Sequence, residues 1–331
     1  MESIGKLYGF YDPEEMRDFF RKKSKKMFNK VTSLKKYITE NLKDGDYITA
    51  GHSAIERTPV AALMELLKEL RVKPRKNLKY GAMGGGFSTI FIFSSNLFKA
   101  CDVSYTAGLE ALGIPRIIRK RFETGEIKVT EWTNATLSWR VKAAGMGLPF
   151  LPARDLLTTD TKKYSASKEI MCPFTSKKYA AIPALYPDIA FIHVHAADIY
   201  GNCYIKGTVC ADVDMAKASK KVVITTERLV PTDFFRDNPQ NTTIPFYLVD
   251  AVVEVPFGAH PGGMPFEYAM DVEFLKYMIK MFENENSFND FMEKYIYGCN
   301  DFIEFIELCG GINYINKLRH KALQIKTFEE E

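Results

Sequence analysis

The chain has 331 residues, enough for one large α/β domain or two smaller ones. Its 46% hydrophobic and 26% charged residues are typical of a globular protein and exclude a disordered or fibrous chain. The formal net charge of +4 is small, and the only dense basic cluster is RKKSKKMFNK at 21–30. Because nucleic-acid binding usually needs a concentrated basic face, we expect a solvated helix face there and no nucleic-acid partner.

The six cysteines are scattered without CxxC spacing, which indicates reduced thiols rather than a zinc ribbon or a disulfide framework. The first residues, MESIGKLYGFYDPEEM, are charged early and lack the apolar core of a signal peptide. No apolar run is long enough to span a membrane. We therefore expect a cytoplasmic protein with no membrane partner.

The first predicted element is a helix over residues 13–31. Its sequence places Pro13 at the start, acids in the first turn and bases in the last, which suits the helix dipole. This helix precedes the main pattern of the chain. We therefore expect residues 1–31 to form an added helical extension that packs on the core or on a partner.

From residue 32 onward, predicted strands alternate with predicted helices, which indicates a mainly parallel, doubly wound α/β sheet. Ligands bind such sheets at the carboxyl ends of the strands. The tail from about 271 predicts two or three helices with aromatic residues for a core or subunit interface, broken by NENSFND and by Gly310-Gly311. Residues 32–325 are expected to form a single domain whose C-terminal part is helical. The main strands are expected at 47–51, at the start of KNLKYGAMGGG (76–86), and at 100–105, 127–132, 188–196, 221–227 and 250–256.

Glycine-rich loops follow several of these strands. In AGHSAIERTP at 50–59, Gly51, His52 and Ser53 follow a strand where backbone amides can hold an oxyanion or phosphate, although a plain tight turn is the alternative. The glycines of GAMGGGF at 81–87 do not fit GxGxxG and no GK[ST] follows, so a nucleotide loop is disfavoured. Close approach of the backbone to a ligand or a second subunit fits better.

The sequence also allows two other kinds of site to be considered. His193 and His195 lie two apart in a strand, as metal ligands can, but HxH alone is a weak signal and no metal site is expected. No GxSxG elbow or comparable nucleophile context is present, so serine hydrolase chemistry is excluded. Acids near strand ends remain candidates for a cleft, and Glu110 is preferred over Glu56 and Glu131.

Four segments, DAVVEVPFGAHPGG, DYITAGHSAIERTP, LPFLPARD and ADVDMAKASKKVVITTE, resemble the alpha subunit of two-chain family I coenzyme A transferases, closest to the glutaconate type. The resemblance covers residues 32 to 320. It implies a CoA-transferase that forms a glutamyl-CoA thioester, with coenzyme A as substrate and no permanently bound cofactor. The nucleophilic glutamate is expected on a homologous beta subunit, because the Glu-Ser-Gly or Glu-Asn-Gly motif is absent from this chain.

The resemblance also implies that this chain forms part of the acid-binding pocket at the subunit interface. SYTAGLEALG at 104–113 resembles the substrate loop of the family in length but departs from it at Leu109 and Glu110, so the substrate is expected to differ from glutaconate. The residues expected to contribute to this substrate or interface site are Gly51, His52, Ser53, Arg57, Gly84, Gly85, Gly86, Tyr105, Thr106, Glu110, Asn134, Gly258 and His260.

Three alternatives stay open at this point. A related branch of hydrolases that open a steroid-derived ring carries an acid where Asn134 aligns, and an amide cannot take up a proton as a carboxylate does. A homologous two-chain decarboxylase is the second alternative, since the residue that distinguishes it would lie on the partner. A non-catalytic ligand sensor of the same fold is the third, but the first 30 residues are too short for a helix-turn-helix domain.

Overall fold

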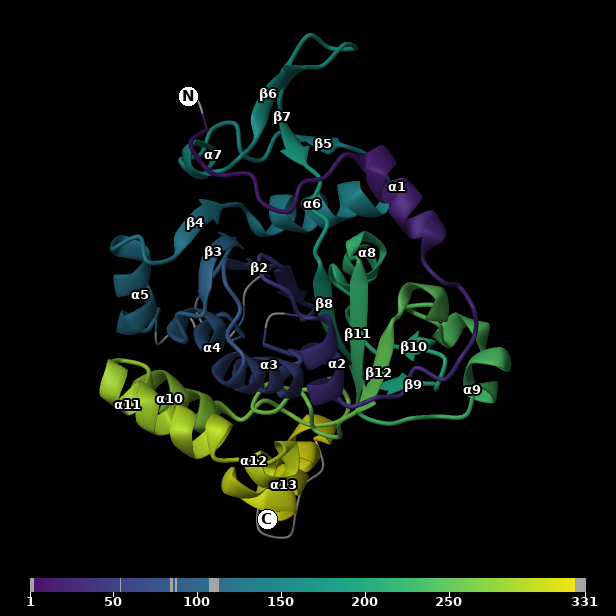
Figure 1. Cartoon of the computed structure of the whole chain (residues 1–331), viewed down its shortest axis with the longest axis vertical. Coiled ribbons are helices and arrows are strands. Elements are labelled where there is room, and N and C mark those ends of the chain that lie inside the picture. The colour runs from purple at the N-terminus through teal and green to yellow at the C-terminus, as the bar shows by residue number, and fades with distance from the viewer. Residues whose placement is uncertain (1–2, 54, 84–85, 87, 107–112, 325–331) are drawn as a thin grey trace.

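The computed structural model describes residues 3–53, 55–83, 86, 88–106 and 113–324. Its centre is a seven-stranded sheet in which all neighbouring strands run parallel, so the expected parallel α/β fold is confirmed (Figure 1). From edge to edge the strands are β12 (Ala251–Glu254), β11 (Lys221–Thr226), β8 (Ile189–Val194), β1 (Tyr47–Ala50), β2 (Leu78–Ala82), β3 (Phe98–Val103) and β4 (Lys128–Glu131).

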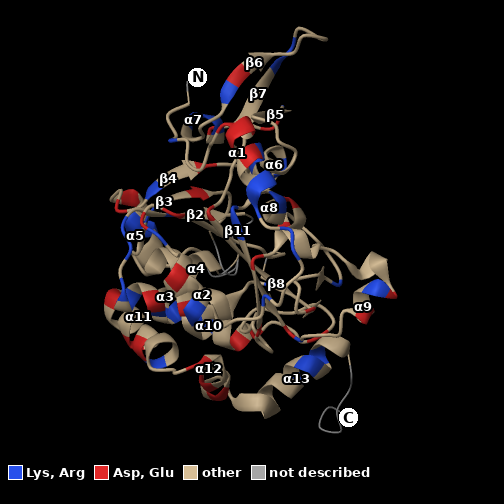
Figure 2. Ribbon diagram, turned by 45° about the vertical axis from the view of Figure 1, so that its right-hand side comes forward, with Lys and Arg blue, Asp and Glu red and all other residues tan. Residues whose placement is uncertain are grey.

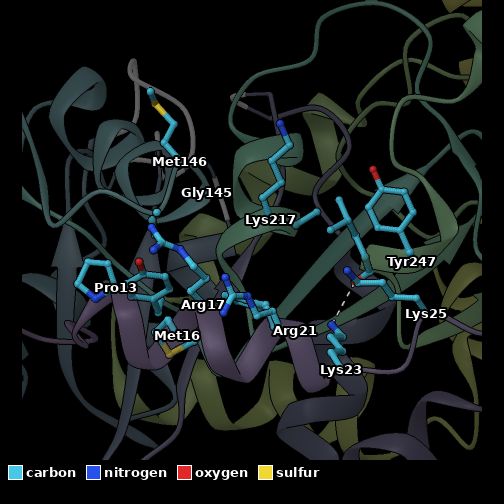
Figure 3. Close-up of a pocket in the computed structure, with 16 residues that line it drawn as sticks. Pro13, Met16, Arg17, Arg21, Lys23, Lys25, Gly145, Met146, Lys217 and Tyr247 are labelled. Carbon is cyan, nitrogen blue, oxygen red and sulfur yellow. Dashed lines mark hydrogen bonds between the residues drawn. The ribbon is translucent and has the colours of Figure 1, made fainter.

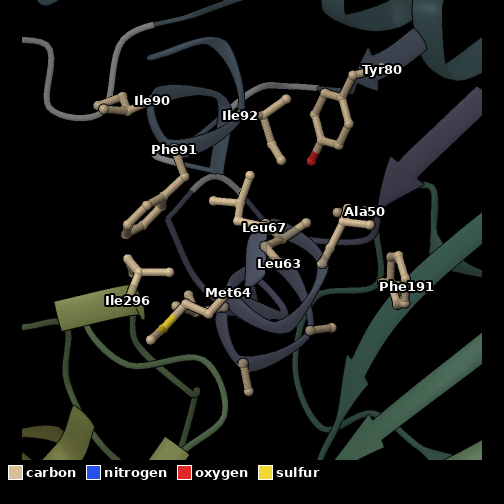
Figure 4. Close-up of a cluster of buried hydrophobic side chains, with 14 of the residues drawn as sticks. Ala50, Leu63, Met64, Leu67, Tyr80, Ile90, Phe91, Ile92, Phe191 and Ile296 are labelled. Carbon is tan, nitrogen blue, oxygen red and sulfur yellow. The ribbon is translucent and has the colours of Figure 1, made fainter. Parts of the chain in front are cut away.

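Helices cover both faces of the sheet, and each face has its own hydrophobic core. Alternate strand residues point to opposite faces, so Ile48 belongs to one core and Tyr47 to the other. The first core is covered by α2 (Leu34–Asn41), α3 (Val60–Val72), α4 (Ser88–Ser94) and α5 (Arg116–Glu123), and Figure 4 shows part of it. The second is covered by α1 (Pro13–Lys22), α6 (Asn134–Gly145) and α8 (Asp212–Ala218).

A buried polar network attaches the start of the chain to the sheet. Arg140 donates from Nη1 to the Asp102 carboxylate at 2.7 Å and from Nη2 to the Tyr8 carbonyl at 2.6 Å. Asp102 also accepts from the Tyr47 hydroxyl at 2.9 Å and from the Trp132 indole N–H at 2.5 Å. A buried charge is stable only when it is paired and hydrogen-bonded. The network therefore fixes the segment before α1 against β1, β3 and α6.

The N-terminal helix is present but shorter than expected. It begins after Asp12, whose carboxylate accepts from the Glu14 N–H at 2.8 Å, and it ends at Lys22 rather than near 31. Like charges four residues apart, such as Lys22 and Lys26, weaken a helix, and Lys23 instead binds Asp250 at 2.7 Å. Residues 23–30, here called the basic strap, contain no helix or strand. The expectation of a solvated helix face over 21–30 is therefore wrong beyond Lys22.

Two small antiparallel sheets were not expected from the sequence. The larger has the order β5 (Phe150–Ala153), β7 (Lys178–Pro183) and β6 (Lys168–Met171), and it projects from the main body beside α7 (Thr161–Tyr164) (Figure 1). The smaller pairs β9 (Ala196–Ala197) with β10 (Cys203–Tyr204). β5 and β6 are mostly exposed, so they lack the apolar runs that identified the central strands.

Between residues 271 and 324, the described C-terminal part contains four α-helices rather than two or three. They are α10 (Val272–Met281), α11 (Glu285–Phe291), α12 (Phe302–Leu308) and α13 (Gly311–Leu323), with a π-helical turn at Met292–Tyr297. The segment NENSFND, expected to be a break, begins α11, because the Asn284 side chain accepts from the Ser287 N–H at 3.0 Å. Gly310 and Gly311, with φ of 110° and 68°, separate α12 from α13 as expected.

The remaining regular elements are short: α9 (Asp233–Arg236) and two 3₁₀ turns at Pro239–Asn241 and Phe246–Leu248. None of the helices in the described ranges is sufficiently long and apolar to cross a bilayer. Figure 2 shows Lys and Arg interspersed with Asp and Glu over most elements. This distribution agrees with the small net charge of the chain.

Candidate active-site pocket at the switch point of the sheet

The direction of winding reverses between β1 and β8. After β1 the chain adds β2, β3 and β4 on one side, and it then returns to place β8 and β11 on the other side. The connections that leave the carboxyl ends of β1 and β8 therefore diverge. In open α/β sheets this point forms the usual ligand crevice.

A cavity of about 300 Å³ lies at this reversal. That volume is at the lower end of the range for small-molecule sites. Its walls come from the loop after β1, the end of β2, the first turns of α6 and α8, and the residues just before α8. The lining residues are Ala50, Gly51, His52, Ser53, Met83, Asn134, Ser138, Cys210, Ala211, Asp212 and Met215.

Gly51 is the point where the backbone of β1 approaches the opposite wall. A Cβ at this position would lie 2.5 Å from Oδ1 of Asp212 and 3.2 Å from Cγ1 of Ile192. The first distance is shorter than real Cβ contacts and the second is tight, so glycine allows the close approach here. Directly after it, Ser53 and Glu56 exchange two backbone hydrogen bonds of 2.9 Å. The loop is therefore a tight turn that presents His52 and Ser53 to the cavity.

Arg57 and Asp212 form a fully buried ion pair behind this wall. The guanidinium donates from Nη1 and Nη2 to the two carboxylate oxygens at 3.1 and 3.0 Å, and from Nη2 to the Thr208 carbonyl at 2.9 Å. Both side chains have zero exposure. The predicted site residue Arg57 thus braces the pocket and does not line it. Sequence reasoning missed Asp212, although it lies in the ADVDMAKASKK segment that carried the resemblance.

Asn134 is the first residue of α6 and lines the pocket, together with Ser138 one turn later. The helix begins there because Thr133 forms a capping box with Thr136: the Thr133 hydroxyl accepts from the Thr136 N–H at 3.1 Å. Asn134 is exposed, so its amide can donate to and accept from a bound molecule. The sequence analysis named Asn134 but missed Ser138.

The Gly258–His260 loop follows β12 and does not line this pocket. The Gly258 carbonyl accepts from the Ala61 N–H at 3.0 Å, at the start of α3. His260 is fully buried beside Phe274 and Phe305, and neither ring nitrogen has a hydrogen-bond partner among the described residues. Burial lowers the pKa of His260 to about 3, so the ring is neutral. The structure gives this histidine a place in the core of the C-terminal helices.

Three other predicted site residues lie after strands at the same edge of the sheet. Tyr105 and Thr106 follow β3 and are half-buried. Gly86 is buried, and its carbonyl accepts from the Thr89 N–H at 3.1 Å at the start of α4. None of these three lines the cavity. Gly84, Gly85 and Glu110 lie outside the described residues.

Both histidines of the HxH pair are held by protein groups. His193 is 2.8 Å from the Thr225 hydroxyl through Nδ1 and 2.7 Å from the Glu227 carboxylate through Nε2. His195 accepts from the Lys206 N–H at Nδ1, so its Nε2–H donates to the Pro265 carbonyl at 2.8 Å. All four ring nitrogens are thus engaged by groups of the described chain.

The described lining of the cavity contains hydroxyls, an amide, an imidazole and a thiol, and its one carboxylate is paired with Arg57. Asp212 binds Arg57 and also accepts from the Cys210 N–H at 3.2 Å. A carboxylate held in this way is a weak nucleophile. Glu56 and Glu131, considered from the sequence, do not line the cavity, although burial raises the pKa of Glu131. The described pocket can therefore position an acid or amide group, and we find no free nucleophilic carboxylate in it.

Comparison with known proteins identifies the class of protein to which this chain belongs. The sequence profile of coenzyme A transferases matches residues 31–255. The A-type subunit of the glutaconate CoA-transferase of Acidaminococcus fermentans is 30% identical, over 87% of this chain and 94% of its own. An uncharacterised protein of Archaeoglobus fulgidus is 40% identical, over 96% of this chain and 71% of its own.

Solved structures agree. The crystal structure of the A. fermentans glutaconate coenzyme A-transferase superposes with a TM-score of 0.82 at 28% identity, covering 87% of this chain and 95% of that one. A variant of the decarboxylase AibA/AibB superposes with a TM-score of 0.66 at 25% identity, covering 85% of this chain and 99% of that one. The chain belongs to the coenzyme A transferase family. Within it, the chain is of the family I alpha-subunit type, as the sequence motifs predicted.

Proposed function

We propose that this chain is the alpha subunit of a heteromeric CoA-transferase that moves CoA between an acyl-CoA and a carboxylic acid. The nucleophilic glutamate then belongs to a beta subunit. The observation that carries this proposal is the switch-point pocket, whose one described carboxylate, Asp212, is committed to Arg57. The relative from A. fermentans is itself named as one subunit of its enzyme, which supports a second chain.

In the proposed reaction the partner's glutamate attacks the thioester carbonyl, the C–S bond breaks and CoA leaves as a thiolate. The thiolate attacks the glutamyl carbonyl of the resulting anhydride, which releases the first acid and leaves a glutamyl-CoA thioester. A second carboxylate attacks this thioester and expels the thiolate, which then takes the new acyl group and frees the glutamate. Covalent catalysis thus divides one difficult transfer into easier steps.

This chain contributes the wall on which the acid is positioned. Asn134 and the hydroxyls of Ser53 and Ser138 supply hydrogen bonds to a carboxylate. Close approach at Gly51 keeps the β1 loop against Asp212, so these donors face one small space. A cavity of about 300 Å³ favours a short or medium-chain acid.

The direct test is intact-mass analysis of this chain, alone and with a candidate partner that carries the Glu-Ser-Gly or Glu-Asn-Gly motif. After incubation with short acyl-CoA thioesters, borohydride reduces a glutamyl thioester to an alcohol, so the modified subunit loses one oxygen and gains two hydrogens. We expect the change on the partner, and only when this chain is present. Modification of this chain alone would place the nucleophile here and contradict the proposal.

A pocket variant tests the role of the acid site. Ser138→Leu fills the cavity and is expected to raise KM for the accepting acid at least about tenfold, through lost hydrogen bonding and overpacking. Ala135→Leu is the matched control, because Ala135 is exposed on the same helix and does not line the cavity. Equal effects of the two variants would place the acid elsewhere.

The likeness to the AibA/AibB decarboxylase favours one second candidate, a component of a two-chain acyl-CoA decarboxylase. It predicts carbon dioxide release from a carboxylated acyl-CoA without exchange of CoA between acids. Isotope exchange between labelled free acid and acyl-CoA distinguishes the two, because only the transferase supports it.

A further inference from the structure

A second cavity, of about 380 Å³, opens at the opposite ends of the helices that line the switch-point pocket. Asn134 of α6 and Asp212 of α8 lie at the first pocket, whereas Gly145 at the end of α6 and Lys217 in the last turn of α8 line the second. Helix α1, the basic strap and the 3₁₀ turn at Phe246–Leu248 complete its walls. We call this cavity the strap cleft, and Figure 3 shows it.

The strap cleft is basic. Its lining includes Arg17, Arg21, Lys23, Lys25 and Lys217, and none of its described lining residues is Asp or Glu. In Figure 3, Arg17 and Arg21 lie on α1, and Lys217 lies across the opening from them. A cavity with one sign of charge concentrates ions of the opposite sign.

Only part of this positive charge is neutralised within the chain. Arg17 pairs with Glu14 at 2.7 Å and Lys23 with Asp250 at 2.7 Å. Arg21 reaches Asp18 only at 3.4 Å, and both of those side chains are well exposed, so that pair is weak. Lys25 and Lys217 have no hydrogen bond or ion pair with the described part of the chain. At least three cations are thus available to a ligand.

The strap that carries Lys25 is anchored on both sides of it. Lys23 is tied to Asp250, and the Lys30 Nζ donates to the Phe246 carbonyl at 2.6 Å. The Lys30 backbone N–H also donates to the Ile199 carbonyl at 2.8 Å. The position of Lys217, taken by itself, is explained by its favourable interaction with the negative end of the α8 dipole. That explanation does not extend to Lys25, which the anchored strap holds at the same opening.

The other lining residues are apolar or aromatic. Met16 and Phe20 of α1 face the cleft with Tyr186 and Leu248, and Tyr247, with 45% exposure, stands at its edge. Aromatic side chains supply flat surfaces on which a ring can stack. The cleft therefore combines an apolar, ring-sized wall with several separated cations.

We propose that the strap cleft binds an organic phosphate that carries an aromatic base, of the adenosine phosphate class. Separated cations suit a multiply charged phosphate chain, and the aromatic edge suits the base. Such a ligand could be a free nucleotide or the nucleotide end of a larger molecule such as CoA. This site lies at the other ends of α6 and α8 from the switch-point pocket, so the inference stands apart from the proposed transfer reaction.

The test uses isothermal titration of the full chain with ADP, which measures binding and not transfer. We expect saturable 1:1 binding that weakens between about 50 and 200 mM salt, because the contacts are ionic. The double variant Lys25→Gln/Lys217→Gln should weaken ADP binding at least about tenfold through loss of two charge-assisted hydrogen bonds. Tyr247→Ala should weaken binding of ADP while leaving that of inorganic pyrophosphate unchanged.

The matched control is Lys73→Gln/Lys120→Gln, which removes two exposed lysines from α3's end and from α5 with the same change of charge. It should change affinity less than twofold. Equal losses of ADP affinity in the two double variants would show that only the general positive potential of the protein attracts ADP, and would overturn the proposal. The absence of saturable ADP binding would overturn it as well. Competition between ADP and CoA for one site identifies the nucleotide end of CoA as a source, whereas ADP binding that CoA does not displace identifies a free nucleotide.

Discussion

The buried pair of Arg57 and Asp212 allows the sharpest test of how the switch-point pocket is held together. Asp212→Ala would leave the Arg57 guanidinium buried with zero exposure and with only the Thr208 carbonyl as acceptor. Removing one partner of a buried pair typically destabilises a protein by about 3–5 kcal/mol. We expect the destabilisation of Asp212→Ala to fall in this range.

This free energy translates into a measurable shift in melting temperature. An unfolding entropy of about 2.1 cal/mol/K per residue gives about 0.7 kcal/mol/K for the 331 residues. The expected loss therefore lowers Tm by about 4–7 °C, which differential scanning calorimetry resolves. The double variant Arg57→Met/Asp212→Leu should recover at least half of this shift, because it removes both charges from the interior.

A matched control uses an exposed pair. Glu14→Ala removes the partner of Arg17 on α1, where both side chains are largely exposed, and should change stability by less than about 1 kcal/mol. If Asp212→Ala melts within about 1 °C of the wild type, the buried ion pair does not stabilise the fold as argued. A double variant less stable than the single variant would likewise contradict the reasoning.

Two further predictions concern glycine packing and pH. Gly51→Ala places a Cβ 2.5 Å from Oδ1 of Asp212, so we expect at least about 2 kcal/mol of destabilisation in denaturant titrations, and a neutral result would mean that the wall relaxes freely. His260 has a folded-state pKa of about 3, below the ordinary value of 6.5, so its contribution is favourable above pH 6.5 and is lost as pH falls toward 3. At pH 5 this loss is about 2 kcal/mol, and His260→Phe should remove that part of the pH dependence. An unchanged pH profile in His260→Phe would refute the assignment.

The central strands could be predicted because their signals are local. The β-branched run KVVITTE, residues 221–227, contains all of β11. Strands of a parallel sheet are buried on both faces and therefore appear as apolar runs. The β5–β7 sheet escaped prediction because its outer strands are short and mostly exposed.

The candidate site was only partly predictable, for a different reason. Gly51, His52, Ser53 and Asn134 were identified by motif or resemblance, and all four line the pocket. Asp212 was missed because its partner Arg57 lies 155 positions away, and sequence alone does not indicate that pairing. The role of the predicted site residues in catalysis, and the division of the chain at residue 31, stay predictions.

The attachment of the first residues has a consequence for the order in which the chain can fold during synthesis. The Gly9 carbonyl accepts from the Tyr186 N–H at 2.8 Å, and the Thr32 N–H donates to the Val252 carbonyl at 3.0 Å. The partners described for this segment, such as Arg140, Tyr186 and Val252, are therefore synthesised long after it. Long-range contacts of this kind close late and slow the folding of a domain. The N-terminal segment is thus synthesised before its partners and is among the last parts of the described fold to reach its native position.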